Sequence, residues 1–163
     1  MGSLMRGLFL TIVATLSACN APCDPSRLDP GWIEARVGGR DWIGGTTTWT
    51  LAGSSLQINS VSAGGWFVSF VVQAASDGAP IADALDEGAF PIAIRLEPTG
   101  DGGWATMYPD TGSSFSTRLG EGGTMTVEAY DGAELQACFD FHAMSNDDDD
   151  LDVTRGQLRA VAL

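Results

Sequence analysis

The chain has 163 residues, enough for one domain of ordinary size and too few for two. Its 21 glycines and 7 prolines indicate many turns, and its hydrophobic content of 44% is typical of a globular protein. All eight basic residues are arginine, and the 21 acids give a net charge of −13, which disfavours nucleic acid as a partner because phosphate backbones are repelled.

The first residues have the layout of a secretory signal. Arg6 is the only charged side chain before Cys19, and the apolar run 7–15 follows it. A short basic region followed by about 7–15 apolar residues is typical of an export leader. A permanent membrane-spanning helix needs about 20 apolar residues, so this run is too short to be one.

The run Leu16-Ser17-Ala18-Cys19 resembles the lipobox of bacterial lipoproteins. The resemblance implies a signal peptide over residues 1–18, cleavage before Cys19, and acyl chains such as palmitate attached there. The expected partner is then a lipid bilayer, because two or more acyl chains hold a protein stably. Asn20 follows Cys19, which in the enterobacterial sorting pattern implies passage to the outer membrane. The alternative is an ordinary secretory signal cleaved near a cysteine.

Two cysteines remain once Cys19 is set aside as the lipidation site. Cys23 and Cys138 form an even pair, as expected of a protein in an oxidising compartment. We predict a disulfide between them, which would join the N-terminal tether to a late strand. The alternative is that Cys138 is a reduced thiol in the core.

Residues 19–31 carry three prolines and are predicted to form a tether that starts at the lipidated cysteine. Residues 32–163 are predicted to form one domain. Turn signals recur in that domain about every 8–12 residues, which indicates a sandwich or a barrel. Asp131-Gly132 is a hairpin signal. The only expected helical turn is Ile81–Leu85. Alternating or β-branched strands are expected at 33–37, 41–43, 46–51, 56–58, 66–73, 90–96, 104–108, 114–119, 124–130, 135–143 and 153–161.

The predicted fold class is therefore all-β: an antiparallel β-sandwich, jelly-roll-like, or a partly closed barrel, with about nine or ten strands. Four features resemble a group of uncharacterised bacterial lipoproteins with small β-sandwich domains. They are the Gly-Gly-Arg-Asp-Trp turn at 38–42, the late hairpin at 125–143, a polar loop, and Val-Thr-Arg-Gly-Gln-Leu at 153–158. The resemblance implies a fold and a cellular address, and it implies no activity.

Cys138, Asp140 and His142 alternate along one strand and so share a face. Same-face neighbours lie about 6.5–7 Å apart, which suits a metal ion or a nucleophile–base pair. A metal would need a further ligand, and a catalytic triad would need an oxyanion site. The opposite face is the apolar one, so the favoured interpretation is a solvated outer face carrying a disulfide.

Asp148, Asp150 and Asp152 have the one-three-five spacing that opens a calcium loop. Val153 stands where such a loop needs glycine and Arg159 where it needs glutamate, so the EF-hand motif fails. A surface calcium site is the alternative to a solvated hairpin tip, and no other cofactor is expected.

Five tryptophans offer a platform for sugar stacking, and Trp104 with Tyr108 is the pair most expected to be exposed. Trp66 is expected in the core, and so are Trp42 and Trp49.

The leading functional hypothesis is a non-enzymatic envelope lipoprotein with a binding or structural surface, whose partner would be a glycan or an envelope protein. The rivals are a carbohydrate- or calcium-dependent binding module and a small hydrolase that uses Cys138, Asp140 and His142.

Overall fold

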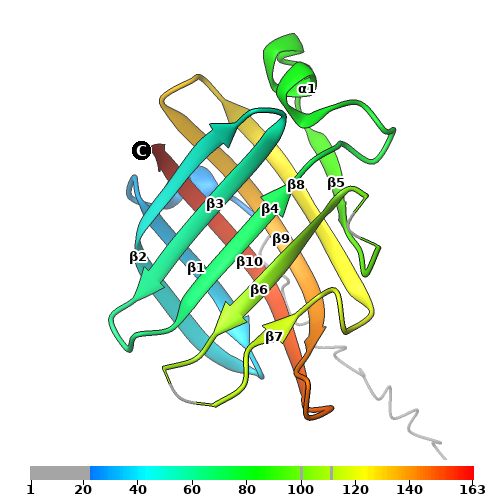
Figure 1. Cartoon of the computed structure of the whole chain (residues 1–163). Coiled ribbons are helices and arrows are strands. Elements are labelled where there is room, and N and C mark those ends of the chain that lie inside the picture. Colours follow the sequence, from blue (N-terminus) through cyan, green and yellow to red (C-terminus); the bar gives the residue numbers. More distant parts are fainter. Residues whose placement is uncertain (1–22, 100, 111) are drawn as a thin grey trace, which may run out of the picture.

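The computed structural model describes residues 23–99, 101–110 and 112–163, and this part of the chain is an all-β domain, as predicted (Figure 1). It contains ten strands, within the predicted number, together with one 3-10 helix and one short α-helix. In chain order the elements are η1 (Pro25–Arg27), β1 (Trp32–Val37), β2 (Arg40–Ala52), β3 (Ser55–Ser62), β4 (Phe67–Val72), α1 (Ile81–Glu87), β5 (Ile92–Leu96), β6 (Gly103–Tyr108), β7 (Phe115–Ser116), β8 (Gly122–Tyr130), β9 (Glu134–Met144) and β10 (Asp150–Ala162).

Nine of the strands pair in a closed ring. The order around the ring is β1, β2, β3, β4, β6, β5, β8, β9 and β10, and β10 pairs again with β1. The tenth strand, β7, makes short pairings with both β6 and β9. Almost all pairings are antiparallel, as predicted. The exceptions are short parallel contacts between β5 and β6 and between β10 and β2.

The hydrophobic core lies inside the ring, because alternate residues of each strand point inward. Phe70 of β4 packs against Phe139 and Phe141 of β9, with ring centroids 4.9 and 6.1 Å apart. Trp49 is buried, whereas Trp42 and Trp66 are only partly buried against this core. Val68, Phe70 and Val72 of β4 are all buried in this core.

Three local features refine the sequence-based expectations. The runs 41–43 and 46–51 belong to one strand, β2, which continues through an irregularity between Gly45 and Thr48. The strand expected at 114–119 is reduced to the two residues of β7. The single expected helical turn is confirmed as α1, which ends where Gly88 adopts a left-handed conformation with φ of 67°. Figure 1 shows α1 at one end of the ring of strands.

Candidate functional site: a groove beside the disulfide

The segment that precedes β1 lies on the outer face of the closed ring of strands. Cys23 is bonded to Cys138, which points outward from the middle of β9, and their Cα atoms lie 6.1 Å apart. The short helix η1 follows and packs against β9 and β10. The structure thus places the predicted disulfide between the tether and a late strand, and part of the predicted tether is held against the barrel.

Gln157 is the polar residue that this segment covers. It points outward from β10 opposite Cys138, yet its side chain is only 2% exposed because the N-terminal segment lies over it. Its amide oxygen accepts a hydrogen bond of 3.0 Å from the backbone N–H of Asp24 and lies 3.8 Å from the Cys23 sulfur. Its amide nitrogen donates to the Glu34 carboxylate on β1. Gln157 therefore joins the N-terminal segment to two strands of the wall.

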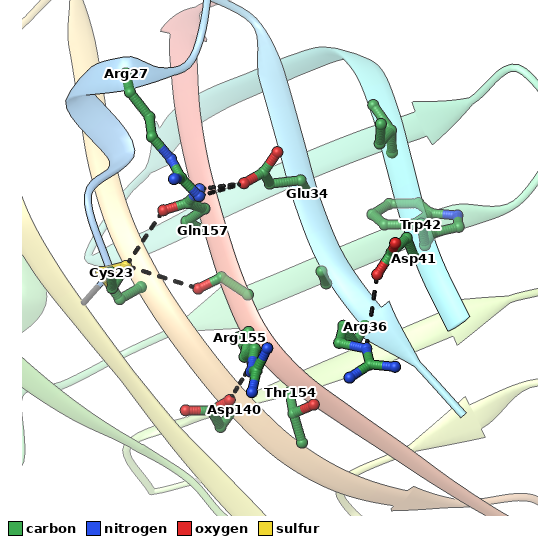
Figure 2. Close-up of a pocket in the computed structure, with 14 residues that line it drawn as sticks. Cys23, Arg27, Glu34, Arg36, Asp41, Trp42, Asp140, Thr154, Arg155 and Gln157 are labelled. Carbon is green, nitrogen blue, oxygen red and sulfur yellow. Dashed lines mark hydrogen bonds and ion pairs between the residues drawn. A yellow bond between two sulfur atoms is a disulfide. The ribbon is translucent and has the colours of Figure 1, made fainter. Parts of the chain in front are cut away.

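Beside the disulfide, the outer wall is hollowed into a groove of about 650 Å³ (Figure 2). Three of the chain's eight arginines line it, and they come from different elements: Arg27 from η1, Arg36 from β1 and Arg155 from β10. The remaining residues that line the groove are Cys23, Glu34, Ala35, Asp41, Trp42, Ile43, Cys138, Asp140, Thr154, Gly156 and Gln157.

Each acidic residue of the groove is held near arginine. The Arg27 guanidinium donates to Glu34 at 2.8 Å, and Arg36 lies 3.6 Å from Asp41. Arg36 also donates to the backbone oxygen of Gly39 at 2.7 Å. The groove therefore presents matched positive and negative groups, an arrangement that suits a polar or charged ligand better than an apolar one.

A bulge in β10 brings Arg155 into the groove. The register between β10 and β9 shifts between Val153 and Gly156, so Thr154 and Arg155 together face Asp140. Arg155 adopts a left-handed conformation with φ of 54°, and its backbone N–H donates to the Asp140 carboxylate at 2.6 Å. Bulges are often found where a side chain is redirected at a site. Here the bulge turns two successive residues toward solvent at the groove.

Cys138, Asp140 and His142 share the outer face of β9, as expected, but they have separate partners. Cys138 is in the disulfide, so it has no thiolate to offer while that bond is intact. Asp140 accepts from the Arg155 backbone. His142 accepts from the backbone N–H of Glu121 at 3.3 Å and lies 3.4 Å from Asp150. The contacts therefore do not join the three side chains into one relay.

The predicted calcium residues lie at the hairpin between β9 and β10. Asp148 has a left-handed backbone with φ of 61°, and Asp150 lies near His142. Within the described residues, no three His, Cys, Asp or Glu side chains gather in a way that could hold a metal ion.

The predicted sugar platform lies on β6, on the side of the barrel opposite β10 in the order of the ring. One face of the Trp104 ring is covered by Arg118, whose guanidinium carbon lies 3.8 Å from the ring centroid. Tyr108 is 45% exposed and lies 5.7 Å from the ring of Phe67. Trp104 is therefore less open than expected, whereas Tyr108 and Phe67 form a small aromatic pair on the surface.

Cys19, the residue expected to be lipidated, and the expected signal peptide over residues 1–18 lie outside the described residues. Among the helices of the described part, none is long and apolar enough to span a bilayer. Comparison with protein-family models, with curated proteins and with solved structures finds no match for this chain. The resemblance to uncharacterised lipoproteins therefore stays an expectation drawn from short motifs.

The arginine groove is the part of the site that the sequence did not predict. Arg36 lies just before the short motif at 38–42, and Arg155 lies within the motif at 153–158. Neither motif indicates which residues these arginines will meet in the folded domain. The arginines are separated by up to 128 residues, and only the pairing of β1 with β10 brings them to one wall. The predicted disulfide was the one sequence feature that could have indicated the groove. A tether bonded to β9 must lie over the neighbouring strands, and a groove can form beside it.

Proposed function

We propose that this chain is a lipid-anchored protein of the bacterial envelope, whose barrel is a non-enzymatic binding or structural domain. The observation that carries the proposal is the bond between Cys23 and Cys138. Disulfides persist in oxidising compartments and are rare in the cytosol, so this bond favours export. Cys23 lies four residues after Cys19, and the leader and the lipobox-like run precede both residues. Export and lipidation explain both features together.

The finer architecture belongs to the same proposal. We take the domain to be a closed barrel rather than a sandwich, because the nine strands pair in a complete ring, although β5 meets β6 at one residue pair only, Leu96 with Gly103. The interior is filled by large apolar side chains such as Phe70 and Phe139, so any ligand would bind on the outer wall. The groove beside the disulfide is the surface best furnished with donors and acceptors for that purpose.

Two observations favour binding over catalysis. Cys138 is the predicted nucleophile of the hydrolase hypothesis, and its sulfur is already bonded. His142, the predicted base, contacts Glu121 and Asp150 instead of Asp140. A nucleophile and its base must lie within hydrogen-bond reach for the hydrolase hypothesis to hold.

The test is the intact mass of the protein extracted from membranes of a bacterial host. We expect a chain that begins at Cys19 and carries lipid, with two hydrogens fewer than its thiol form because Cys23 and Cys138 are bonded. The Cys19→Ala variant should lose the lipid mass and leave the membrane fraction. A wild-type protein that keeps Met1, lacks lipid and stays in the cytosol would overturn the proposal.

The membrane address is tested by a second substitution. In an enterobacterial host, Asn20 is expected to let the protein pass to the outer membrane, and Asn20→Asp should retain it in the inner membrane. Density-gradient separation of the two membranes measures the difference. The same distribution for both variants would contradict the proposed sorting while leaving the mass test intact.

A further inference from the structure

The disulfide shortens the tether between the lipid and the barrel. An extended chain spans about 3.3–3.6 Å per residue, so the four residues from Cys19 to Cys23 reach about 14 Å at most. If the chain were held only at Trp32, where β1 begins, the thirteen residues from Cys19 would reach about 45 Å. The bond to Cys138 therefore restricts a lipidated Cys19 to the immediate neighbourhood of the groove wall.

The attachment point is on the side of the barrel and not at one of its ends. Cys138 lies in the middle of β9 (Glu134–Met144), and Gln157 beside it lies in the middle of β10 (Asp150–Ala162). Figure 2 shows Cys23 on this wall, with Arg27, Arg36 and Arg155 around the same groove. An anchor of this length on the wall would bring the long side of the barrel toward the bilayer.

Arginine is concentrated on the groove wall. Residues 23–52 and 134–163, which supply η1, β1, β2, β9 and β10, carry five arginines and eleven acids. Residues 53–133, which supply the wall from β3 to β8, carry two arginines and ten acids. Both walls are acidic overall, so the attraction of an anionic surface for the groove wall would act through the arginines of the groove itself, within about 8–10 Å at ordinary ionic strength.

From these observations we infer that the groove wall lies on the membrane that holds the anchor, with Arg27, Arg36 and Arg155 bound to the phosphate groups of its phospholipids. The inference rests on the proposed lipidation of Cys19. The side chains of Arg27 and Arg36 are 53% and 44% exposed beside their acidic neighbours. A guanidinium has five N–H donors, so one that contacts a carboxylate still has donors for a phosphate.

The absence of lysine from the chain gives a direct test of this orientation. Arg36→Lys and Arg95→Lys each introduce a single lysine, on the groove wall in one variant and on β5 in the other, and labelling of that lysine removes one positive charge in both. Both arginines are exposed and lie 3.6 Å from an acid, Asp41 and Glu97 respectively, so the two variants are matched. Each lysine is labelled with an amine-reactive fluorophore on the lipidated protein, with the unsubstituted protein as the blank.

The labelled proteins are reconstituted in vesicles of phosphatidylethanolamine and phosphatidylglycerol that contain a phospholipid with a nitroxide quencher on its headgroup. We expect the label at position 36 to lose most of its fluorescence and the label at position 95 to lose little. Equal loss at both positions, or greater loss at 95, would overturn the inference. Intact mass is recorded on the same samples, so missing lipid would count against the proposed function instead.

A charge variant tests the role of the arginines separately from the tether. Arg27→Gln combined with Arg155→Gln, in the Arg36→Lys background, should reduce the loss of fluorescence at position 36. The matched control also removes two arginines, by Arg95→Gln combined with Arg118→Gln on the other wall, and should leave that loss unchanged. Near-ultraviolet circular dichroism and the disulfide mass confirm folding. A folded double variant with undiminished quenching would show that the arginines bind no phosphate.

Discussion

Gly156 of β10 lies directly against the aromatic ring of Phe139 on the neighbouring strand β9. A Cβ atom built on this glycine would lie 2.2 Å from a ring carbon of Phe139, far inside van der Waals contact. The glycine directly follows the bulge residues Thr154 and Arg155. Glycine at this position lets Phe139 pack on Phe70 in the core while the bulge opens toward the groove.

We expect Gly156→Ala to destabilise the protein by about 1–3 kcal/mol, the usual cost of overpacking a core. The added methyl group has to displace either the Phe139 ring or the β10 backbone. The free energy of unfolding, measured by urea denaturation, checks the prediction. Gly45→Ala in β2 is the control, because a Cβ there meets nothing within 4 Å, and we expect a change within about 0.5 kcal/mol. Equal effects would contradict the packing argument.

Breaking the bond between Cys23 and Cys138 should also lower stability. The bond closes a loop across a separation of 115 residues, which on the chain-entropy model is worth up to about 5 kcal/mol. In a Cys19→Ala background, reductant should move the urea midpoint down. The Cys23→Ser/Cys138→Ser variant should match the reduced protein and ignore reductant. A midpoint that reductant leaves unchanged in the Cys19→Ala protein that keeps Cys23 and Cys138 would contradict this prediction.

Much of the fold could be predicted from sequence because strand alternation is a local property. The inward face of β9 follows from every second residue being apolar, and the Asp131-Gly132 turn between β8 and β9 is a two-residue signal. The closure of the ring was not predictable in this way. It depends on β10 pairing with β1 across the whole domain, and no local pattern specifies which strand a distant strand will meet.

Of the candidate site, only the disulfide could be predicted from sequence, because a cysteine can form this bond only with another cysteine. Two cysteines remaining after Cys19 allow only one pairing, and the structure shows that pairing. The groove was missed because Arg27, Arg36 and Arg155 lie far apart in sequence and arginine has no preferred spacing. Trp104 was expected to be open to solvent, but Arg118 lies fourteen residues away on a different segment and stacks on its ring. Side-chain contacts of this kind follow from tertiary structure.

Gln157 should contribute to stability although it points away from the core. Gln157→Leu keeps a similar volume but removes the hydrogen bonds to Asp24 and Glu34. We expect a loss of about 1–3 kcal/mol in the free energy of unfolding, because these polar groups would remain partly buried without their partner. Gln136→Leu is the matched control, since Gln136 lies on the same outer face of the neighbouring strand and is half-buried. A similar small change in the free energy of unfolding for both variants would show that the contacts of Gln157 with the N-terminal segment do not stabilise the fold.

The turn between β8 and β9 should make stability depend on pH through Asp131. Its carboxylate accepts hydrogen bonds from the backbone N–H groups of Glu134 at 2.8 Å and Ala133 at 2.9 Å. These two bonds, in that order of size, hold the pKa of the Asp131 carboxyl below its usual range, with a smaller contribution from the charge of Arg159.

Because the pKa is lowered in the folded state, the carboxylate stabilises the fold at pH values above the ordinary pKa of an aspartate. That contribution is lost as the pH falls through the lower folded-state value. Asp131→Asn keeps an oxygen that accepts both bonds but cannot ionise. We therefore expect the wild type to unfold at a higher urea concentration than this variant at neutral pH. In acid, where the carboxylate is protonated, the two urea midpoints should become equal. Asp86→Asn on the exposed helix α1 controls for the loss of one negative charge. A difference that is constant across the pH range would show that the hydrogen bonds of this turn do not distinguish the ionised carboxylate from a neutral acceptor.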